Sequence, residues 1–177
     1  LIVATHGRSL WIADISWVEQ LTSGLGNQQA YLFQPKNRVQ WKRLAENHSS
    51  SSNFSGESEA AGVPIRFYLK DSDSEVVISI FDGPRLIHEM KVEGQAGLNQ
   101  VTWNYQKRVR ERTAEEMEEL RKRMERFRGA GRAGGGRGVS EMNYIMTQAG
   151  PGDYTVKLSA GGSESKRQFT VARDSWR

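Results

Sequence analysis

The sequence contains no cysteine and only four prolines, and it lacks any long run of apolar residues. The absence of cysteine excludes disulfide bonds, thiolate catalysis and cysteine-ligated metals, and it is compatible with either a reducing cytosol or a bacterial cell envelope. A transmembrane helix needs about 20 consecutive apolar residues, and no segment approaches that length. Hydrophobic residues fill 37% of the 177 positions, so the chain is large enough to bury a core.

The chain also lacks the residue patterns of a metal or catalytic centre. His48 and His88 are isolated, and neither has a second ligand at the spacing of a metal site. Asp71, Asp73 and Glu75 alternate across a turn, but no glycine-containing frame of twelve residues follows, so turn chemistry explains them better than a calcium loop. We therefore expect no metal, no cofactor and no catalytic residue in this chain.

The positive charge of the chain is concentrated in one segment. The whole sequence has 25 Lys and Arg against 21 Asp and Glu, a formal net charge of +4. Residues 108–137 alone hold ten Lys and Arg against six Glu, which accounts for all of that charge. The basic character is therefore local, and we expect no nucleic-acid partner for the domain as a whole.

Residues 1–15 predict a β-hairpin. Two apolar runs flank His6-Gly7-Arg8, where the glycine supplies the positive φ of a tight turn. A two-stranded hairpin is only marginally stable in water, so we expect its partner strands to lie elsewhere. Because the chain opens inside a strand and without Met, we expect a piece of a larger protein, with any signal peptide absent or upstream.

Residues 16–62 predict a linker. Ser16-Trp-Val-Glu19 has the form of a capping box, which predicts a short helix that ends by Gly24. Short extended pieces follow on either side of Pro35. The stretch from His48 to Gly62 is serine-rich and almost without apolar residues, so we expect a mobile loop that cannot offset its ordering entropy by burial.

From residue 63 to 177 the hydrophobic pattern changes to a period of two, which is typical of strands with one buried face. Turn residues such as Asp82-Gly83-Pro84 and Gly161-Gly162 separate these strands. Seven short strands at this spacing predict an antiparallel β-sandwich. The residues expected in its core at alternating positions are Val101, Trp103, Tyr154, Val156 and Leu158.

Residues 108–138 interrupt the strands and predict a helical insert. Thr113-Ala-Glu-Glu116 has the form of a capping box, and a helix is expected over about 114–128. The stretch 129–138 resembles arginine-glycine RNA-binding repeats, but it has no interleaved Phe or Tyr, so a flexible connection is favoured. The apolar stripe of the helix is expected to pack against its own protein, the alternatives being a partner helix or a membrane surface. That stripe comprises Met117, Leu120, Met124 and Phe127.

Two parts of the sequence resemble known families. The segment ATHGRSLWIAD at 4–14 resembles the last hairpin of the β-propellers of secreted sortilin-like proteins, whose bacterial members often carry the label BNR-repeat glycosyl hydrolase. The segments VVISIFDGPRLI, GLNQVTWN, AGPGDYTVKLSAGG and FTVARD resemble the flagellar-hook-capping type of immunoglobulin-like domain that follows such propellers. This second resemblance covers about 63–107 and 148–174, and it implies that Trp103 and Tyr154 stack in the core. The insert is a departure from the family pattern.

The expected fold is therefore mainly β. It comprises the terminal hairpin of a β-propeller at 1–15, a linker at 16–62, and an antiparallel immunoglobulin-like β-sandwich at 63–177 that carries the helical insert 108–138. The resemblance implies a non-catalytic C-terminal accessory module of a secreted or periplasmic, envelope-associated bacterial propeller protein. Such a module would support the upstream propeller and mediate protein–protein contact.

Two alternatives stay open at this point. The chain could be a carbohydrate-binding module of a propeller glycoside hydrolase, with exposed rings such as Trp17, Trp41 and Trp176 as a sugar platform. It could also be a fragment of an enzyme whose active site lies upstream, although the neuraminidase Asp-box Ser-x-Asp-x-Gly-x-Thr-Trp is absent from this chain. The candidate ligand-binding residues are His6 and Arg8, which could bind an anionic group on a propeller rim, and Trp41.

Overall fold

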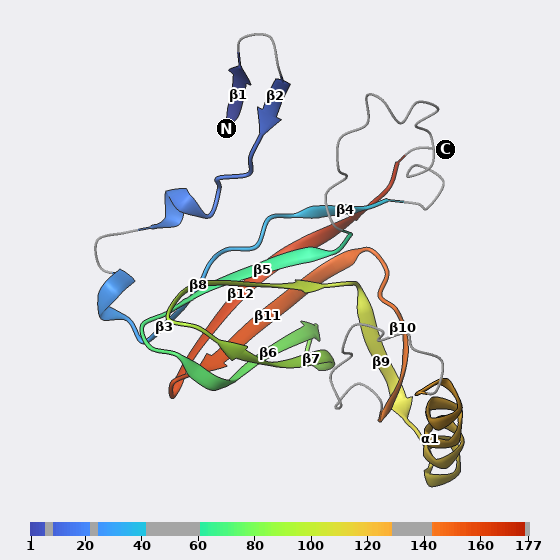
Figure 1. The fold of residues 1–177 in the computed structure, drawn as a ribbon. Helices are drawn as coiled ribbons and strands as arrows, with labels where there is room; N and C mark the ends of the chain where they lie inside the picture. Colours follow the sequence, from blue (N-terminus) through green and yellow to red (C-terminus); the bar gives the residue numbers. More distant parts are fainter. Residues whose placement is uncertain (6–8, 22–24, 42–60, 129–142, 176–177) are drawn as a thin grey trace.

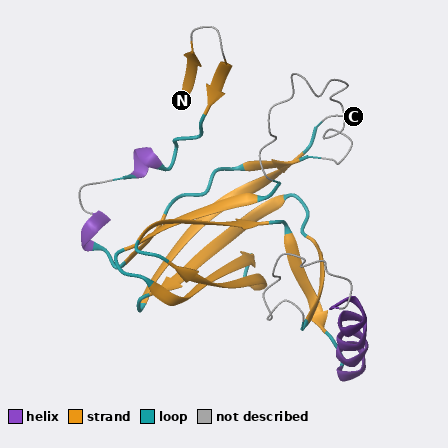
Figure 2. Cartoon of the chain, in the orientation of Figure 1, coloured by secondary structure: helices purple, strands orange, loops and turns teal. Residues whose placement is uncertain are grey.

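The computed structural model describes residues 1–5, 9–21, 25–41, 61–128 and 143–175, and it confirms a mainly β protein with one α-helix in these ranges (Figures 1 and 2). The Ser-rich stretch, the turn His6-Gly7-Arg8 and the arginine-glycine stretch 129–138 lie wholly or mostly outside the described residues. The strands are β1 (Ile2–Thr5), β2 (Ser9–Ile12), β3 (Ala30–Leu32), β4 (Arg38–Gln40), β5 (Val63–Leu69), β6 (Asp73–Asp82), β7 (Arg85–Gly94), β8 (Gly97–Trp103), β9 (Gln106–Glu111), β10 (Tyr144–Gln148), β11 (Gly152–Ala160) and β12 (Ser163–Arg173).

Two sheets form the body of the protein. One has the strand order β4-β12-β11-β6-β7 and the other the order β3-β5-β8. All neighbouring strands are antiparallel except β4, which runs parallel to β12. Both sheets contribute buried side chains to one core, because a strict period of two turns every second residue inward, as along β5. The four inward residues of β5 are Val63, Ile65, Phe67 and Leu69.

The centre of the core is aromatic. Trp103 is fully buried, and its ring meets Tyr154 edge-to-face at 5.0 Å between centroids and Phe169 at 5.9 Å. The Trp103 indole N–H donates to the Gln106 carbonyl at 2.8 Å, so the buried ring keeps a hydrogen bond. Val156 and Leu158 lie on the same face of β11 as Tyr154 and are also buried.

The backbone turns sharply after Trp103. Tyr105 has a φ of 57°, which ends β8 and starts β9 in a new direction. The alternation of Val101, Trp103 and Tyr105 in the sequence predicts one face of a single strand, and this prediction is wrong because the strand ends at Trp103. Tyr105 nevertheless stays buried, with its ring 5.7 Å from that of Trp103.

A two-stranded ribbon, β9 with β10, leads from this turn to the helix α1 (Ala114–Arg128) (Figure 1). The helix and its capping box are confirmed: the Thr113 N–H donates to Glu116 Oε2 at 2.9 Å, and the Glu116 N–H donates to Thr113 Oγ1 at 3.3 Å. Strand β9 spans residue 108, where the insert was expected to start. Its pairing with β10 was not predicted from the sequence. Along the helix, Met117 and Leu120 are half-buried and Met124 is exposed, whereas the Phe127 side chain lies outside the described part.

The segment before the sheets contains two single 3₁₀ turns, η1 (Val18–Gln20) and η2 (Leu25–Asn27). The capping box expected at Ser16 is not formed, because the N-cap position of η1 is Trp17 and has no side-chain cap. Ser16 instead donates through its backbone N–H and its hydroxyl to Asp14 Oδ1, at 3.1 and 2.8 Å. This local hydrogen bonding competes with a longer helix.

Candidate functional site

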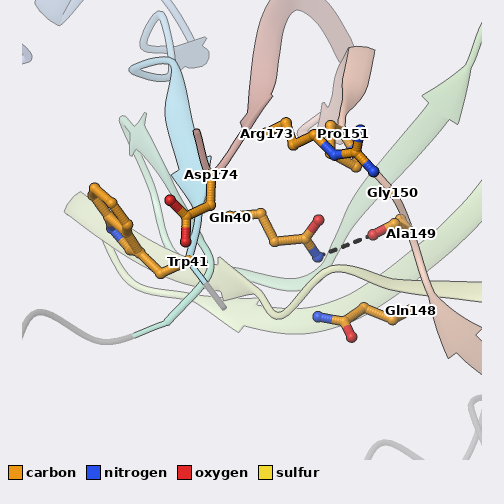
Figure 3. Close-up of a pocket in the computed structure, with 8 residues that line it drawn as sticks. All are labelled: Gln40, Trp41, Gln148, Ala149, Gly150, Pro151, Arg173 and Asp174. Carbon is orange, nitrogen blue, oxygen red and sulfur yellow. Dashed lines mark hydrogen bonds between the residues drawn. The ribbon is translucent and has the colours of Figure 1, made fainter. Parts of the chain in front are cut away.

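The ends of β4 and β12 and the connection between β10 and β11 meet around one hollow at the edge of the five-stranded sheet (Figure 3). Because β4 runs parallel to β12, with Gln40 opposite Arg173, the residues that follow both strands emerge side by side. The connection between β10 and β11 closes the opposite wall. The lining residues are Gln40, Trp41, Gln148, Ala149, Gly150, Pro151, Arg173 and Asp174.

The hollow has a volume of about 790 Å³ and a mixed wall. Figure 3 shows Trp41 and Asp174 on one side, Gln148 and Pro151 on the other, and Gln40 between them. Trp41 is 57% exposed, whereas Asp174 is buried in the wall.

Hydrogen bonds hold the floor of the hollow in place. The Gln40 side-chain amide donates to the Ala149 carbonyl at 3.1 Å, which ties the end of β4 to the β10–β11 connection. The Ala149 N–H donates to the Tyr105 carbonyl at 2.6 Å. Tyr154 donates its hydroxyl proton to the Gly150 carbonyl at 2.5 Å, which fixes the same connection from the core side. The wall opposite Trp41 is thus held by hydrogen bonds to the backbone of Ala149 and Gly150.

The chemistry of this lining suits non-covalent binding. It offers an aromatic face, two amides, one carboxylate and one guanidinium, which together can donate to and accept from a polar ligand. The lining residues that the structure describes include no serine, threonine, cysteine, lysine or histidine that would serve as a nucleophile or a base at neutral pH. Within the described ranges, no group of three or more His, Asp or Glu side chains is arranged to hold a metal ion.

The candidate residues from the sequence fall in different places. Trp41 lines the hollow, whereas His6, Arg8 and Trp176 lie outside the described residues. Trp17 is half-buried, with its ring 6.0 Å from Phe33 and under the Arg66 guanidinium, so it is part of the segment's own packing.

The titratable groups of His88 and Asp73 do not line the hollow. Burial, with a smaller contribution from Arg108, lowers the pKa of His88 to about 4, which keeps this imidazole neutral at physiological pH. Asp73 accepts hydrogen bonds from the N–H groups of Glu75 and Gly161, at 3.0 and 2.8 Å, and these bonds lower the pKa of its carboxyl group. Asp73 therefore organises a turn.

Sequence reasoning missed most of the hollow. Gln148, Arg173 and Asp174 lie more than 100 residues from Trp41 in the chain, and no motif links them. The parallel pairing of β4 with β12 brings them together, and β4 is an edge strand of three residues, too short for its pattern to indicate its partner.

A second candidate surface is the hairpin β1–β2, which projects from the body in Figure 1. Ile2 is 66% exposed and Trp11 is 65% exposed, and Leu1 and Val3 are exposed as well. Val3 pairs with Trp11 and shares its face, whereas Ile2 points to the opposite face. The described part of the hairpin therefore presents apolar side chains on both faces.

Comparisons with family models, with curated proteins and with solved structures found no match to this chain. Within the described part, no helix is long and apolar enough to cross a membrane.

Proposed function

We propose that this chain is a non-catalytic accessory module of a secreted or periplasmic bacterial β-propeller protein, in which the hairpin β1–β2 completes the propeller and the remaining domain supports it. The observation that carries the proposal is the hairpin with exposed apolar side chains on both faces. An isolated hairpin of this kind is at best marginally stable in water, so a partner is needed.

The two apolar faces favour a propeller over a partner that binds one face. A propeller blade is a small sheet that packs against neighbouring blades on both sides, and strands with two covered faces carry apolar residues on both. Ile2 on one face and the pair Val3–Trp11 on the other fit this environment. The resemblance of ATHGRSLWIAD to a terminal propeller hairpin points to the same partner.

The strand order supports an immunoglobulin-like domain as the supporting part. The immunoglobulin arrangement has strands A, B and E in one sheet and G, F and C in the other, and the variable type adds C′ beside C. Strands β3, β5 and β8 correspond in order to A, B and E, and β12, β11, β6 and β7 correspond to G, F, C and C′. Tyr154 lies near the start of β11, the F position, and the bond from its hydroxyl to Gly150, four residues upstream and before the strand, has the form of a tyrosine corner.

The segment between the hairpin and the two sheets makes contacts with the body that support a fixed attachment of the hairpin. Asp14 lies 3.9 Å from the Arg66 guanidinium of β5, and Trp17 packs on Phe33. Gln20 accepts from the Gln34 N–H at 2.7 Å. These contacts anchor the chain directly after β2 to the smaller sheet, so the hairpin would hold the domain close to the propeller.

The coding sequence upstream of Leu1 tests the proposal. We expect segments that repeat every 40–50 residues or so, each with short strands, since propeller blades recur at that period. An initiator methionine directly before Leu1, or an upstream region without such repeats, would contradict the proposal.

A further inference from the structure

The proposed contact with the propeller is made by the hairpin and gives no role to the residues that line the hollow around Trp41. We infer that it is a binding subsite for a neutral pyranose residue of a glycan, with Trp41 as the stacking platform. This inference is independent of the role of the hairpin, because the hollow is built from β4, β12 and the β10–β11 connection.

Trp41 differs from Trp17 and Trp103, the other tryptophans of the body that the structure describes. Trp103 is fully buried and Trp17 is engaged with Phe33 and Arg66, whereas Trp41 leaves more than half of its surface open beside a hollow. An indole ring that is apolar and exposed gains by covering its face with C–H groups, and a pyranose ring offers such a face. The environment of Trp41 therefore suits a ligand that is apolar on one side and polar at its edge.

The polar groups of the wall suit hydroxyl groups at that edge. Gln148 and Gln40 supply planar amides that donate and accept. The Gln40 amide is already fixed by its hydrogen bond to Ala149, so part of the wall is pre-organised for binding.

The charges of the wall favour a neutral ligand. Asp174 and Arg173 carry one charge of each sign on adjacent positions, so their sum is zero. A nucleic acid would need a row of cations, and a proline-rich peptide would need a groove with several aromatic rings. The described part of the lining has one cation and one aromatic ring, and the volume of the hollow lies within the range of small-ligand sites, about 300–1,000 Å³.

Titration of the 177-residue chain with four neutral oligosaccharides tests the inference. The probes are cellohexaose, xylohexaose, mannohexaose and N-acetylchitohexaose, each taken to about 10 mM because one sugar subsite of this kind is expected to have a Kd near about 1 mM. Two-dimensional ¹H–¹⁵N NMR spectra follow the indole N–H of Trp41 and the side-chain amide of Gln148. We expect at least one glycan to shift both signals in a saturable manner.

Variants distinguish glycan binding at Trp41 from glycan binding at another exposed ring. Trp41→Ala should weaken binding at least about tenfold and Gln148→Ala about threefold, whereas the matched control Trp11→Ala, which removes an equally exposed ring on the hairpin, should leave affinity unchanged. Thermal unfolding checks that each variant keeps the fold. The inference is overturned if none of the four glycans shifts the two signals, if Trp41→Ala binds like the parent chain, or if only Trp11→Ala loses binding.

Discussion

The two-sheet body and the hairpin β1–β2 use similar residues with opposite results. In β5 the apolar residues Val63, Ile65 and Phe67 face a second sheet and are buried, whereas in the hairpin Ile2 and Trp11 are exposed. Both regions pair their backbones in regular antiparallel ladders. The difference lies in the second layer, which the body supplies for itself and the hairpin does not. An apolar pattern thus predicts a strand, but it does not indicate which layer covers the apolar face of that strand.

The largest expected effect is loss of the central ring of the body. Trp103→Ala should lower the free energy of unfolding by about 3–5 kcal/mol, because it removes a fully buried side chain and leaves a cavity among Tyr154 and Phe169. Trp17→Ala should cost less, since that ring is only half-buried, and Trp11→Ala should change stability by less than about 0.5 kcal/mol. Chemical denaturation measures all three. Equal costs for Trp103 and Trp11 would remove the contrast between the body and the hairpin.

The second effect is a pH dependence that belongs to the body. The pKa of His88 is about 4 in the folded chain, whereas an unfolded histidine titrates near 6.5. As the pH falls below about 6.5, His88 becomes protonated in the unfolded state while it stays neutral in the folded state. The free energy of unfolding therefore declines, by up to roughly 3 kcal/mol near pH 4. Above about pH 7 this residue adds no pH dependence.

The variant His88→Leu isolates that contribution. Carboxyl groups also titrate near pH 4, so the informative quantity is the difference in slope between the parent chain and the variant from pH 7 to pH 4.5. We expect the variant to have the flatter profile in denaturant titrations. Identical slopes would mean that His88 is protonated equally in both states and is less enclosed by the sheets than the structure indicates.

The smallest expected effect concerns the helix. Residues 113–142 can be replaced by a short Gly/Ser turn, because the Arg112 N–H already donates to the Asn143 carbonyl at 2.8 Å where β9 and β10 begin to pair. We expect a single cooperative transition and a change in stability near the scale of a surface substitution, about 0.5 kcal/mol. Loss of cooperativity would show that the stripe from Met117 to Phe127 belongs to the core, and the body would then extend beyond its two sheets.

Elements with strong local patterns were predictable from the sequence. The helix Ala114–Arg128 follows its capping box and apolar spacing, and the period of two along β5 and β11 anticipated their burial. The ring contact between Trp103 and Tyr154 was anticipated from family resemblance, and the structure gives it as an edge-to-face pair.

Elements that depend on distant pairing were not predictable. Strand β9 (Gln106–Glu111) is rich in charged residues and has little apolar alternation; it pairs with β10, where the Arg108 guanidinium lies over the Tyr144 ring at 4.3 Å. The positive φ of Tyr105 has no local marker, since only glycine adopts that region routinely. The hollow has the first of these difficulties, because it needs the β4–β12 pairing to bring Trp41 to Asp174.

Hydrogen exchange across the hairpin and the body is the most direct test of the account. In the monomeric 177-residue chain, amides of Ile2–Ala4 should exchange with little protection, whereas amides of β11 should require opening free energies close to that of global unfolding. In a polypeptide that also contains the proposed upstream propeller blades, the Ile2–Ala4 amides should become protected to a comparable degree. Strong protection of Ile2–Ala4 in the monomeric chain, or none in the parent polypeptide, would contradict the claim that the hairpin is a propeller strand pair.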